Sequence, residues 1–278
     1  MKLAWLTDIH LNFLDADQRA RFLGTVRGQC DAVVVSGDIG EARSVLGLLE
    51  EMERVLQRPV YFVLGNHDFY RGSIAETRQR ITAASRQSPY LRYLTALEVV
   101  ELSPTTALIG HDGWADARCG NFAETEVILN DFALIREIDT LQEDFTLDKR
   151  RLGPLLHALG DEAAAHFRAT LRQAAARYPR VIAVTHIPPF AEAAWHEGRT
   201  CDEYWLPFMA SRAAGEALRA VMDEHPQSQL TVLCGHTHGA GETVIAPNLR
   251  VWTGAATYGE PEVQRIVECG DQFPDTST

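Results

Sequence analysis

The sequence predicts an α/β fold with a mostly parallel sheet that helices cover on both faces. Short apolar runs rich in β-branched residues alternate with longer segments whose apolar residues recur at helical spacing, as in βαβ units. Several of these runs also end in polar side chains beside a glycine, and parallel sheets bind ligands beyond the carboxyl ends of their strands. The same pattern therefore indicates where functional residues lie.

The N-terminal part contains three such units, each with a strand, a polar strand end and a helix. We expect strands over residues 3–6, 33–35 and 59–64, and helices over residues 15–29, 41–56 and 72–86. The polar residues at the strand ends are Asp8 and His10, Asp38 after Gly37, and Asn66, His67 and Asp68 after Gly65.

The rest of the chain is expected to add a second sheet. Close β-like runs at 90–94, 97–102 and 105–109 lack intervening helices, which indicates hairpins. A long helix is expected at 149–178, a strand at 181–185 ending in His186, a helix at 210–224, and a strand at 230–234 ending in Gly235-His236-Thr237-His238. The last expected strands are 242–246, 249–253 and 263–268.

Two irregular stretches interrupt this pattern. Residues 115–148 are polar and weakly patterned, and residues 190–208 form a loop rich in tryptophan, histidine and acidic residues. Because loops often set substrate choice on a shared scaffold, we expect both to form a substrate-facing cap. No internal repeat or low-complexity linker is present, so residues 1–270 are expected to form a single domain and residues 271–278 a frayed tail.

Composition narrows the class of protein. A net charge of −12 makes the chain a poor non-specific binder of phosphate backbones, so nucleic acid is not an expected partner. Five scattered cysteines without a C-x-x-C pair indicate a reducing compartment. No apolar run reaches the roughly 18 residues of a membrane span. We therefore expect a cytoplasmic protein without membrane contact, of open oligomeric state.

The polar strand ends together resemble a set of metal ligands. They are Asp8, His10, Asp38, Asn66, His67, His186, His236 and His238. For any one of these histidines, a hydrogen-bonded core or capping role is the simpler explanation. The whole set supplies nitrogen and oxygen without thiolate, which favours Mn, Fe, Zn or Co, and it exceeds the needs of one tetrahedral ion. Two divalent or trivalent metal ions are the natural number.

These residues carry a family resemblance. Asp-x-His, Gly-Asp, Gly-Asn-His-Asp, a single histidine and Gly-His-x-His follow one another here as Asp8/His10, Gly37-Asp38, Gly65 to Asp68, His186 and Gly235 to His238. In this order the blocks resemble the calcineurin-like metallophosphoesterases, over roughly residues 1–254. The resemblance implies a four-layer α/β/β/α sandwich and a dinuclear metal centre.

The resemblance also implies roles for single residues. One metal would be bound by Asp8, His10 and His238, the other by Asn66, His186 and His236, with Asp38 bridging the two. Side chains two residues apart on a strand point to the same face, which suggests that His236 and His238 converge on one ion. The family pattern instead assigns the two histidines to different metals. A metal-bridging hydroxide would attack phosphorus in line.

Further residues are candidates for contact with substrate. His67 and Asn66 would contact the phosphate, and His67 would protonate the leaving oxygen. Glu41 lies where some related protein phosphatases carry an acid that orients this histidine, although Ala42-Arg43 departs from the arginine-glycine that usually follows. Arg43 or Arg71 would grip a substrate phosphate.

Several other residues leave alternatives open. His111, Asp112 and Trp114 follow a predicted strand and either face the site or structure a loop. Trp195, His196, Tyr204 and Trp205 either line a pocket or fix the loop 190–208. His157, His166 and His225 lie on predicted helices and are interpreted as surface or packing residues, and Cys234 as a buried strand residue.

The acidic and aromatic character of the two irregular stretches favours a small phosphoester, with an organic or nucleotide group, over a polyanion. Monoester and diester substrates both remain open. The alternatives within the family are a protein serine/threonine phosphatase and a nuclease, which would need a basic groove. A non-catalytic metal-binding scaffold is the alternative outside enzymes, although such a protein would be expected to lose ligands or His67.

Overall fold

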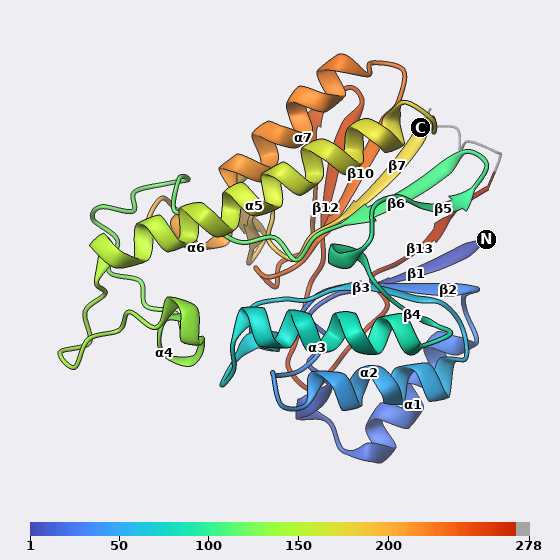
Figure 1. The fold of residues 1–278 in the computed structure, drawn as a ribbon, viewed down its shortest axis with the longest axis horizontal. Helices are drawn as coiled ribbons and strands as arrows, with labels where there is room; N and C mark the ends of the chain where they lie inside the picture. Colours follow the sequence, from blue (N-terminus) through green and yellow to red (C-terminus); the bar gives the residue numbers. More distant parts are fainter. Residues whose placement is uncertain (271–278) are drawn as a thin grey trace.

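The computed structural model describes residues 1–270, in which two β-sheets lie between two layers of helices (Figure 1). The first sheet has the order β13-β1-β2-β3-β4, and the second has the order β11-β12-β10-β7-β6-β5. Helices α1, α2 and α3 cover the first sheet, and α5 and α7 cover the second. The predicted four-layer α/β/β/α sandwich is confirmed.

Three hydrophobic clusters match the three interfaces between these layers. One joins the first sheet to its helices through residues such as Val33, Leu49 and Phe62. Another joins the second sheet to α5 and α7 through residues such as Phe167 and Val232. The third, with Val34 and Val184 among its members, contains residues of both sheets and lies between them. Each sheet is therefore buried on both faces, which explains its continuous apolar strands.

The first sheet is parallel except at one edge. Its parallel strands are β1 (Lys2–Leu6), β2 (Ala32–Ser36), β3 (Val60–Val63) and β4 (Leu91–Tyr93), and β13 (Arg265–Glu268) runs antiparallel beside β1. Its helices are α1 (Ala16–Arg27), α2 (Val45–Leu56) and α3 (Ile74–Gln87). The prediction that residues 90–94 join a hairpin of the second sheet is wrong, because α3 returns the chain to the first sheet and β4 pairs with β3.

The second sheet has a parallel centre and two antiparallel edges. The parallel strands are β6 (Thr106–Gly110), β7 (Arg180–Val184), β10 (Gln229–Cys234) and β12 (Leu249–Thr253). The edge strands are β5 (Val100–Ser103) and β11 (Gly241–Ala246), and the covering helices are α5 (Lys149–Ala175) and α7 (Arg212–Glu224). The predicted hairpin of residues 97–109 is present as β5–β6.

Helix ends differ from the predictions for local reasons. Residues 41–44 form a turn in which the Ser44 hydroxyl accepts a hydrogen bond from the backbone N–H of Glu41, so α2 begins four residues later than expected. Helix α1 begins as predicted behind Asp15, whose carboxylate accepts from the backbone of Gln18 in a capping box.

The two irregular stretches lie at the end of the molecule where the parallel strands finish (Figure 1). The first contains α4 (Asp131–Leu134), and the second contains the hairpin β8–β9 (Trp195–His196 and Arg199–Thr200) and α6 (Leu206–Met209). Short 3-10 turns occur at Leu11–Phe13, His67–Phe69, Leu94–Ala96, Arg136–Ile138 and Ala191–Ala193. No helix within residues 1–270 is both long and apolar enough to cross a membrane. The expected frayed tail lies outside the described residues.

Candidate metal centre

The strand ends that carry the predicted ligands have an unusual backbone. Asp8, His10, Asp38, His236 and His238 have φ angles of 48°, 37°, 54°, 71° and 57°. Non-glycine residues seldom adopt this left-handed region, and such strain concentrates at functional sites. The loops after β1, β2 and β10 therefore turn sharply as each strand ends.

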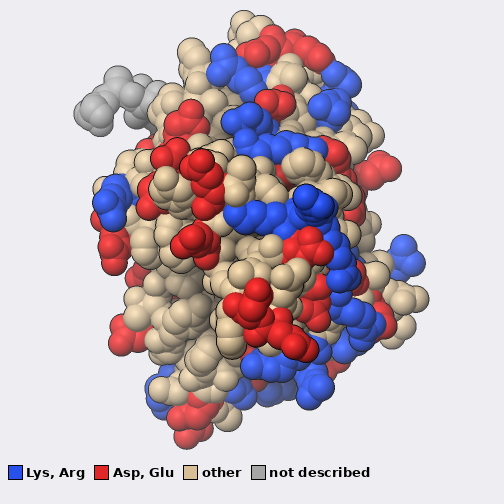
Figure 2. Space-filling model, turned by 90° about the vertical axis from the view of Figure 1, so that its left-hand side faces the viewer, with Lys and Arg blue, Asp and Glu red and all other residues tan. Residues whose placement is uncertain are grey.

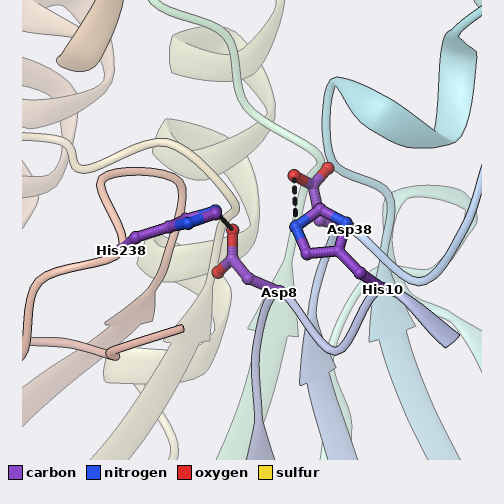
Figure 3. A group of neighbouring side chains, drawn as sticks. All are labelled: Asp8, His10, Asp38 and His238. Carbon is purple, nitrogen blue, oxygen red and sulfur yellow. Dashed lines mark ion pairs between the residues drawn. The ribbon is translucent and has the colours of Figure 1, made fainter. Parts of the chain in front are cut away.

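One group of ligand atoms lies at the ends of β1, β2 and β10 (Figure 3). Asp8, His10, Asp38 and His238 each offer an atom, and these atoms lie within 4.8 Å of one another. The Nε2 of His10 is 3.7 Å from Oδ2 of Asp38, and the Nε2 of His238 is 3.4 Å from Oδ1 of Asp8. The predicted ligands of the first metal are thus brought together.

His10 provides the clearest test of whether this group fits a cation. The residue is 1% exposed, yet neither ring nitrogen has a hydrogen-bond partner in the described part of the chain. Buried polar atoms are almost always paired, because leaving them unpaired costs free energy. Burial also lowers the pKa of His10 to about 4, so the ring is neutral and can offer a lone pair. A metal ion is the partner that this chemistry fits.

A second group lies beside the first, at the ends of β3, β7 and β10. The Oδ1 of Asn66 is 2.9 Å from Nε2 of His186 and 3.1 Å from Nδ1 of His236. The other ring nitrogens face backbone carbonyls, at 2.9 Å from Ser36 O and 3.0 Å from Phe208 O. Because each neutral ring has a single N–H to donate to its carbonyl, the nitrogens that face Asn66 carry lone pairs.

Three acceptor atoms therefore face one another in the second group without a proton between them, and a cation would resolve this arrangement. Burial lowers the pKa of His236 to about 3, which keeps its ring neutral. The predicted ligands of the second metal are also brought together.

Asp38 lies between the two groups. Its Oδ2 is the atom near His10, and its Oδ1 lies 3.4 Å from Nε2 of His186. Burial, together with the nearby charges of Asp8 and Asp68, raises the pKa of Asp38 well above its usual range. A buried carboxylate among other carboxylates needs positive charge nearby, and its position fits a ligand shared by two cations.

Two glycines let the backbone approach these carboxylates. A Cβ on Gly65 would lie 2.1 Å from Oδ1 of Asp38, and a Cβ on Gly235 would lie 1.9 Å from Oδ2 of Asp8. The same backbone donates to the ligands, since the N–H of His67 bonds Oδ1 of Asp38 at 2.9 Å. Glycine is therefore needed at both positions for close approach.

Asp68 fixes two of the ligand loops to each other. Its carboxylate is fully buried and accepts from the N–H groups of Ile39 at 3.0 Å, Gly40 at 2.7 Å and Gly65 at 2.9 Å. The turn that carries Asp38 is thereby held against the turn that carries Asn66. No role was predicted for Asp68 from the sequence, although its place directly after Asn66-His67 in the strand-end motif was a signal.

Asp131 orients Asn66 from α4, in the first irregular stretch. Its Oδ1 accepts from Nδ2 of Asn66 at 2.9 Å and from the Tyr70 hydroxyl at 2.7 Å. Because the carboxylate must receive the amide N–H, the amide oxygen points toward His186 and His236. No role was predicted for Asp131, because it lies in a weakly patterned segment distant from the candidate ligands along the chain.

His67 stands over the centre without replacing a ligand. Its ring stacks on Tyr70 with centroids 4.2 Å apart, lies 4.8 Å from the His10 ring, and brings Nε2 to 3.9 Å from Oδ2 of Asp38. The side chain is 19% exposed and lines the cavity described below. Burial lowers its pKa to about 3, with nearby histidines acting in the same direction.

The other predicted substrate contacts lie elsewhere. Arg71 forms an ion pair with Glu41, and their side chains are 50% and 29% exposed. Arg43 is exposed. None of these three lines the cavity within residues 1–270, and Glu41 has no described bond to His67. Their roles remain predictions.

Asp112 is a structural residue at the junction of the two sheets. It accepts hydrogen bonds from the N–H of Leu64 at 2.8 Å, from Nε of Arg78 at 2.8 Å and from the Tyr93 hydroxyl at 2.6 Å. His111 is buried 3.7 Å from Glu162, and Trp114 is buried against Phe69. Of the alternatives for residues 111–114, a loop-structuring role fits these contacts.

A cavity of about 590 Å³ opens directly over the candidate metal centre. Asp38, His67, His236 and His238 form its floor. Its walls are formed by residues 128–131, 196–197 and 199–202, with Trp205 and Tyr258. His196 and Trp205 thus line a pocket, whereas Trp195 fixes the loop through its Nε1 bond to the Thr243 hydroxyl, at 2.9 Å. Both irregular stretches reach the cavity.

Tyr258 is a wall residue of this cavity that no predicted motif contains. Its ring lies 4.5 Å from the His10 ring and 5.0 Å from the Phe13 ring. It belongs to the loop after β12, which no strand-end motif marked.

The family model of calcineurin-like phosphoesterases matches residues 1–240. The chain is a calcineurin-like phosphoesterase. It is accordingly a phosphoric ester hydrolase by family, which confirms the predicted family and enzyme class. No curated protein matches this phosphoesterase in sequence.

Two solved structures share the fold. The phosphopantetheinyl hydrolase of Mycobacterium tuberculosis is 15% identical, with a TM-score of 0.68 and coverage of 98% of this chain and 97% of that one. A dimetal phosphatase from Danio rerio is 14% identical, with a TM-score of 0.54 and coverage of 92% and 87%. At such low sequence identities, both similarities show a shared fold and nothing further about the phosphoesterase.

Proposed function

We propose that this phosphoesterase binds two metal ions and hydrolyses a phosphomonoester or phosphodiester with a small organic or nucleotide group, through in-line attack of water. The proposal rests on buried acceptor atoms that have no proton to share. The ring nitrogens of His10 have no hydrogen-bond partner within residues 1–270, and ring nitrogens of His186 and His236 face Oδ1 of Asn66. These atoms need cations, and the cavity above them leaves room for a substrate.

Each metal would have its own ligands. Asp8, His10 and His238 would hold one ion, Asn66, His186 and His236 the other, and Asp38 would bridge them. When bound, the two cations supply a nucleophilic water at neutral pH and neutralise charge on the phosphoryl oxygens. Mn, Fe, Zn and Co fit the mixed nitrogen and oxygen ligands.

His67 is placed to donate a proton to the leaving oxygen. Burial keeps its ring neutral in the absence of substrate, so the ring would take up this proton together with the anionic phosphate, whose charge raises the pKa of a neighbouring histidine. Its ring is held by the stack on Tyr70, and it faces the cavity beside Asp38. A donor is needed most when the leaving alkoxide is basic, so the role predicts a dependence on the leaving group. Asn66 completes the phosphate contact, in an orientation fixed by Asp131.

The cavity favours a substrate larger than a simple alkyl phosphate. Its volume lies in the range of pockets that bind drug-sized ligands. Figure 2 shows the end of the molecule that carries the irregular stretches, where basic and acidic side chains are interspersed. This charge pattern supports a small organic phosphoester over a nucleic acid, which would favour a continuous basic surface. A phosphopantetheinyl ester belongs among the candidates because of the shared fold.

The test is hydrolysis of mono- and bis-p-nitrophenyl phosphate with added Mn²⁺. Asp38→Ala is expected to lower kcat/KM by at least about 10²-fold, as loss of preorganised charge stabilisation does. His67→Ala is expected to impair an alkyl phosphate far more than an aryl phosphate, because p-nitrophenolate leaves without protonation. His157→Ala, on α5, is the matched histidine control.

The outcomes separate the alternatives. Metal-dependent hydrolysis that Asp38→Ala abolishes supports the enzyme, and the ratio of diester to monoester rates defines the substrate type. Binding of Mn²⁺ without hydrolysis of any phosphoester, nucleic acid or phosphopeptide would contradict the proposal in favour of a metal-binding scaffold.

A further inference from the structure

The hairpin β8–β9 is a rigid element at the cavity. Its strands Trp195–His196 and Arg199–Thr200 are joined by Glu197 and Gly198, whose φ angles are 48° and 76°. Two residues with positive φ are the mark of the type I′ turn, which matches the twist of a two-stranded hairpin. The hairpin was not predicted from the sequence, which indicated a loop over residues 190–208.

The hairpin is anchored to the loop that carries two metal ligands. Nδ1 of His196 bonds the carbonyl of Thr237 at 2.9 Å, and Thr237 separates His236 from His238. On the same strand, the backbone of Trp195 packs against Gly239, where a Cβ would lie 2.4 Å from the carbonyl oxygen of Trp195. The hairpin therefore has a fixed position relative to the metal centre.

Arg199 stands on this hairpin with a free guanidinium. It is exposed and lines the cavity, and among residues 1–270 its side chain has no hydrogen-bond or ion-pair partner. It is also the one lysine or arginine among the cavity residues of the described chain. Loose surface arginines are common, but this one is carried by an anchored hairpin into the substrate cavity.

None of the acidic residues that line the cavity forms an ion pair with Arg199 in the described part of the chain. Asp131 is occupied by Asn66 and Tyr70, and Oδ1 of Asp202 accepts from the backbone N–H of Trp205 at 3.2 Å. Glu197 is exposed at the turn of the hairpin. A planar guanidinium with five N–H donors thus faces the cavity, and this group binds carboxylate and phosphate in bidentate fashion.

Apolar residues share the cavity with Arg199 and the metal centre. Ile128 is 42% exposed and Trp205 is 44% exposed, and Leu129 and Met209 also line the cavity. The phosphoester of a substrate would therefore contact the metals, and its organic group would contact the apolar side chains. A further group of the substrate would contact the guanidinium of Arg199.

We infer that Arg199 binds a second anionic group carried by the organic part of the substrate. The substrate class is then a phosphoester whose alcohol bears a carboxylate or a further phosphate beyond an apolar spacer. This inference rests on the proposed function and names the substrate class of the same site. Arg199 would act as a specificity-determining residue.

The test uses p-nitrophenyl phosphodiesters whose second ester group is an alkyl chain of varied length. The chain ends in a methyl, a carboxylate or a phosphate, and the measured quantity is the ratio of kcat/KM for each anionic substrate to that for its methyl-ended match. Wild type is expected to prefer one anionic series at a suitable length, and that series identifies the anion.

Arg199→Gln is expected to reduce this ratio about tenfold, the effect of one charge-assisted contact at a partly exposed site. Arg199→Lys should retain part of the preference, because it keeps the charge and loses the planar fork. Glu197→Gln should raise the ratio, since it removes an acid beside the same anion. Arg21→Gln, an exposed position on α1, should leave rate and ratio unchanged.

Two results would overturn the inference while the proposed function stands. They are hydrolysis without a preference for either anion at any chain length, and a preference that Arg199→Gln does not alter. Absence of metal-dependent hydrolysis of every substrate, including the p-nitrophenyl phosphates, would instead overturn the proposed function and the inference together.

Discussion

Replacing His10 by leucine should stabilise the metal-free protein while weakening the metal-bound one. The His10 ring is buried, and neither of its nitrogens has a hydrogen-bond partner within residues 1–270. Unpaired buried polar atoms cost about 1–3 kcal/mol. The ring also contacts Tyr258 and Phe13, at centroid distances of 4.5 and 5.9 Å, and such ring pairs contribute roughly 0.5–1.5 kcal/mol. His10→Leu should therefore raise the free energy of unfolding of the metal-free protein by about 1 kcal/mol.

Bound metal should reverse the order of stability of wild type and His10→Leu. At a Mn²⁺ concentration of about 100 times the dissociation constant, one site stabilises the folded state by about 2.7 kcal/mol. His10→Leu should lose most of that gain at the first site, so that wild type becomes the more stable protein. The two free energies of unfolding follow from urea denaturation, in chelator and in excess Mn²⁺.

Phe13→Leu is the matched control, because it alters the same ring cluster without removing a ligand. It should lower stability slightly in both conditions and leave the Mn²⁺ gain intact. The reasoning is refuted if His10→Leu destabilises the chelated protein by 1 kcal/mol or more and still gains as much from Mn²⁺ as wild type does.

Three further predictions concern the support of the site and its surroundings. Asp131→Asn should lower kcat/KM about tenfold with little change in folding, because the amide of Asn66 loses the carboxylate that orients it. Steady-state kinetics measures the first effect, and circular dichroism the second. Gly65→Ala should abolish metal-dependent activity and destabilise the fold, since its Cβ would lie 2.1 Å from a ligand carboxylate, whereas Gly47→Ala, with open space on α2, should stabilise by about 0.5–1 kcal/mol in urea denaturation. Glu162 has its pKa lowered to about 2, chiefly by His111, whose Nε2 lies 3.7 Å away, and also by Arg78, which donates to it at 2.8 Å. Its stabilisation is therefore present above its ordinary pKa and is lost as the pH falls toward 2. Glu162→Gln should therefore cost less than about 1 kcal/mol at pH 7, with the difference from wild type shrinking below about pH 4 in denaturation series; a difference constant with pH would contradict the assignment.

The meeting of the candidate ligands could be predicted from the sequence because topology alone places them together. Parallel strands end at the same edge of a sheet, so polar residues after β1, β2, β3, β7 and β10 converge whatever the details of packing. A buried strand also has a strong sequence signal, as in the β-branched run before Gly37-Asp38.

The rest depended on contacts that have no local pattern. Asp131 reaches Asn66 from a weakly patterned insertion, and Tyr258 reaches His10 from a loop after the last ligand. The ion pair of Arg71 with Glu41 depends on side-chain geometry that spacing does not specify. The strand at 91–93 was misplaced because a short apolar run does not reveal which sheet it joins.

The central claim is that these strand ends hold two metal ions bridged by Asp38. Electron paramagnetic resonance of the protein titrated with Mn²⁺ tests it most directly, because two bridged Mn²⁺ ions give a spin-coupled spectrum that separate ions do not. We predict a coupled spectrum that is complete at about two Mn²⁺ per chain, and its loss in Asp38→Ala. A single bound ion, or two uncoupled ions in wild type, would contradict the dinuclear centre.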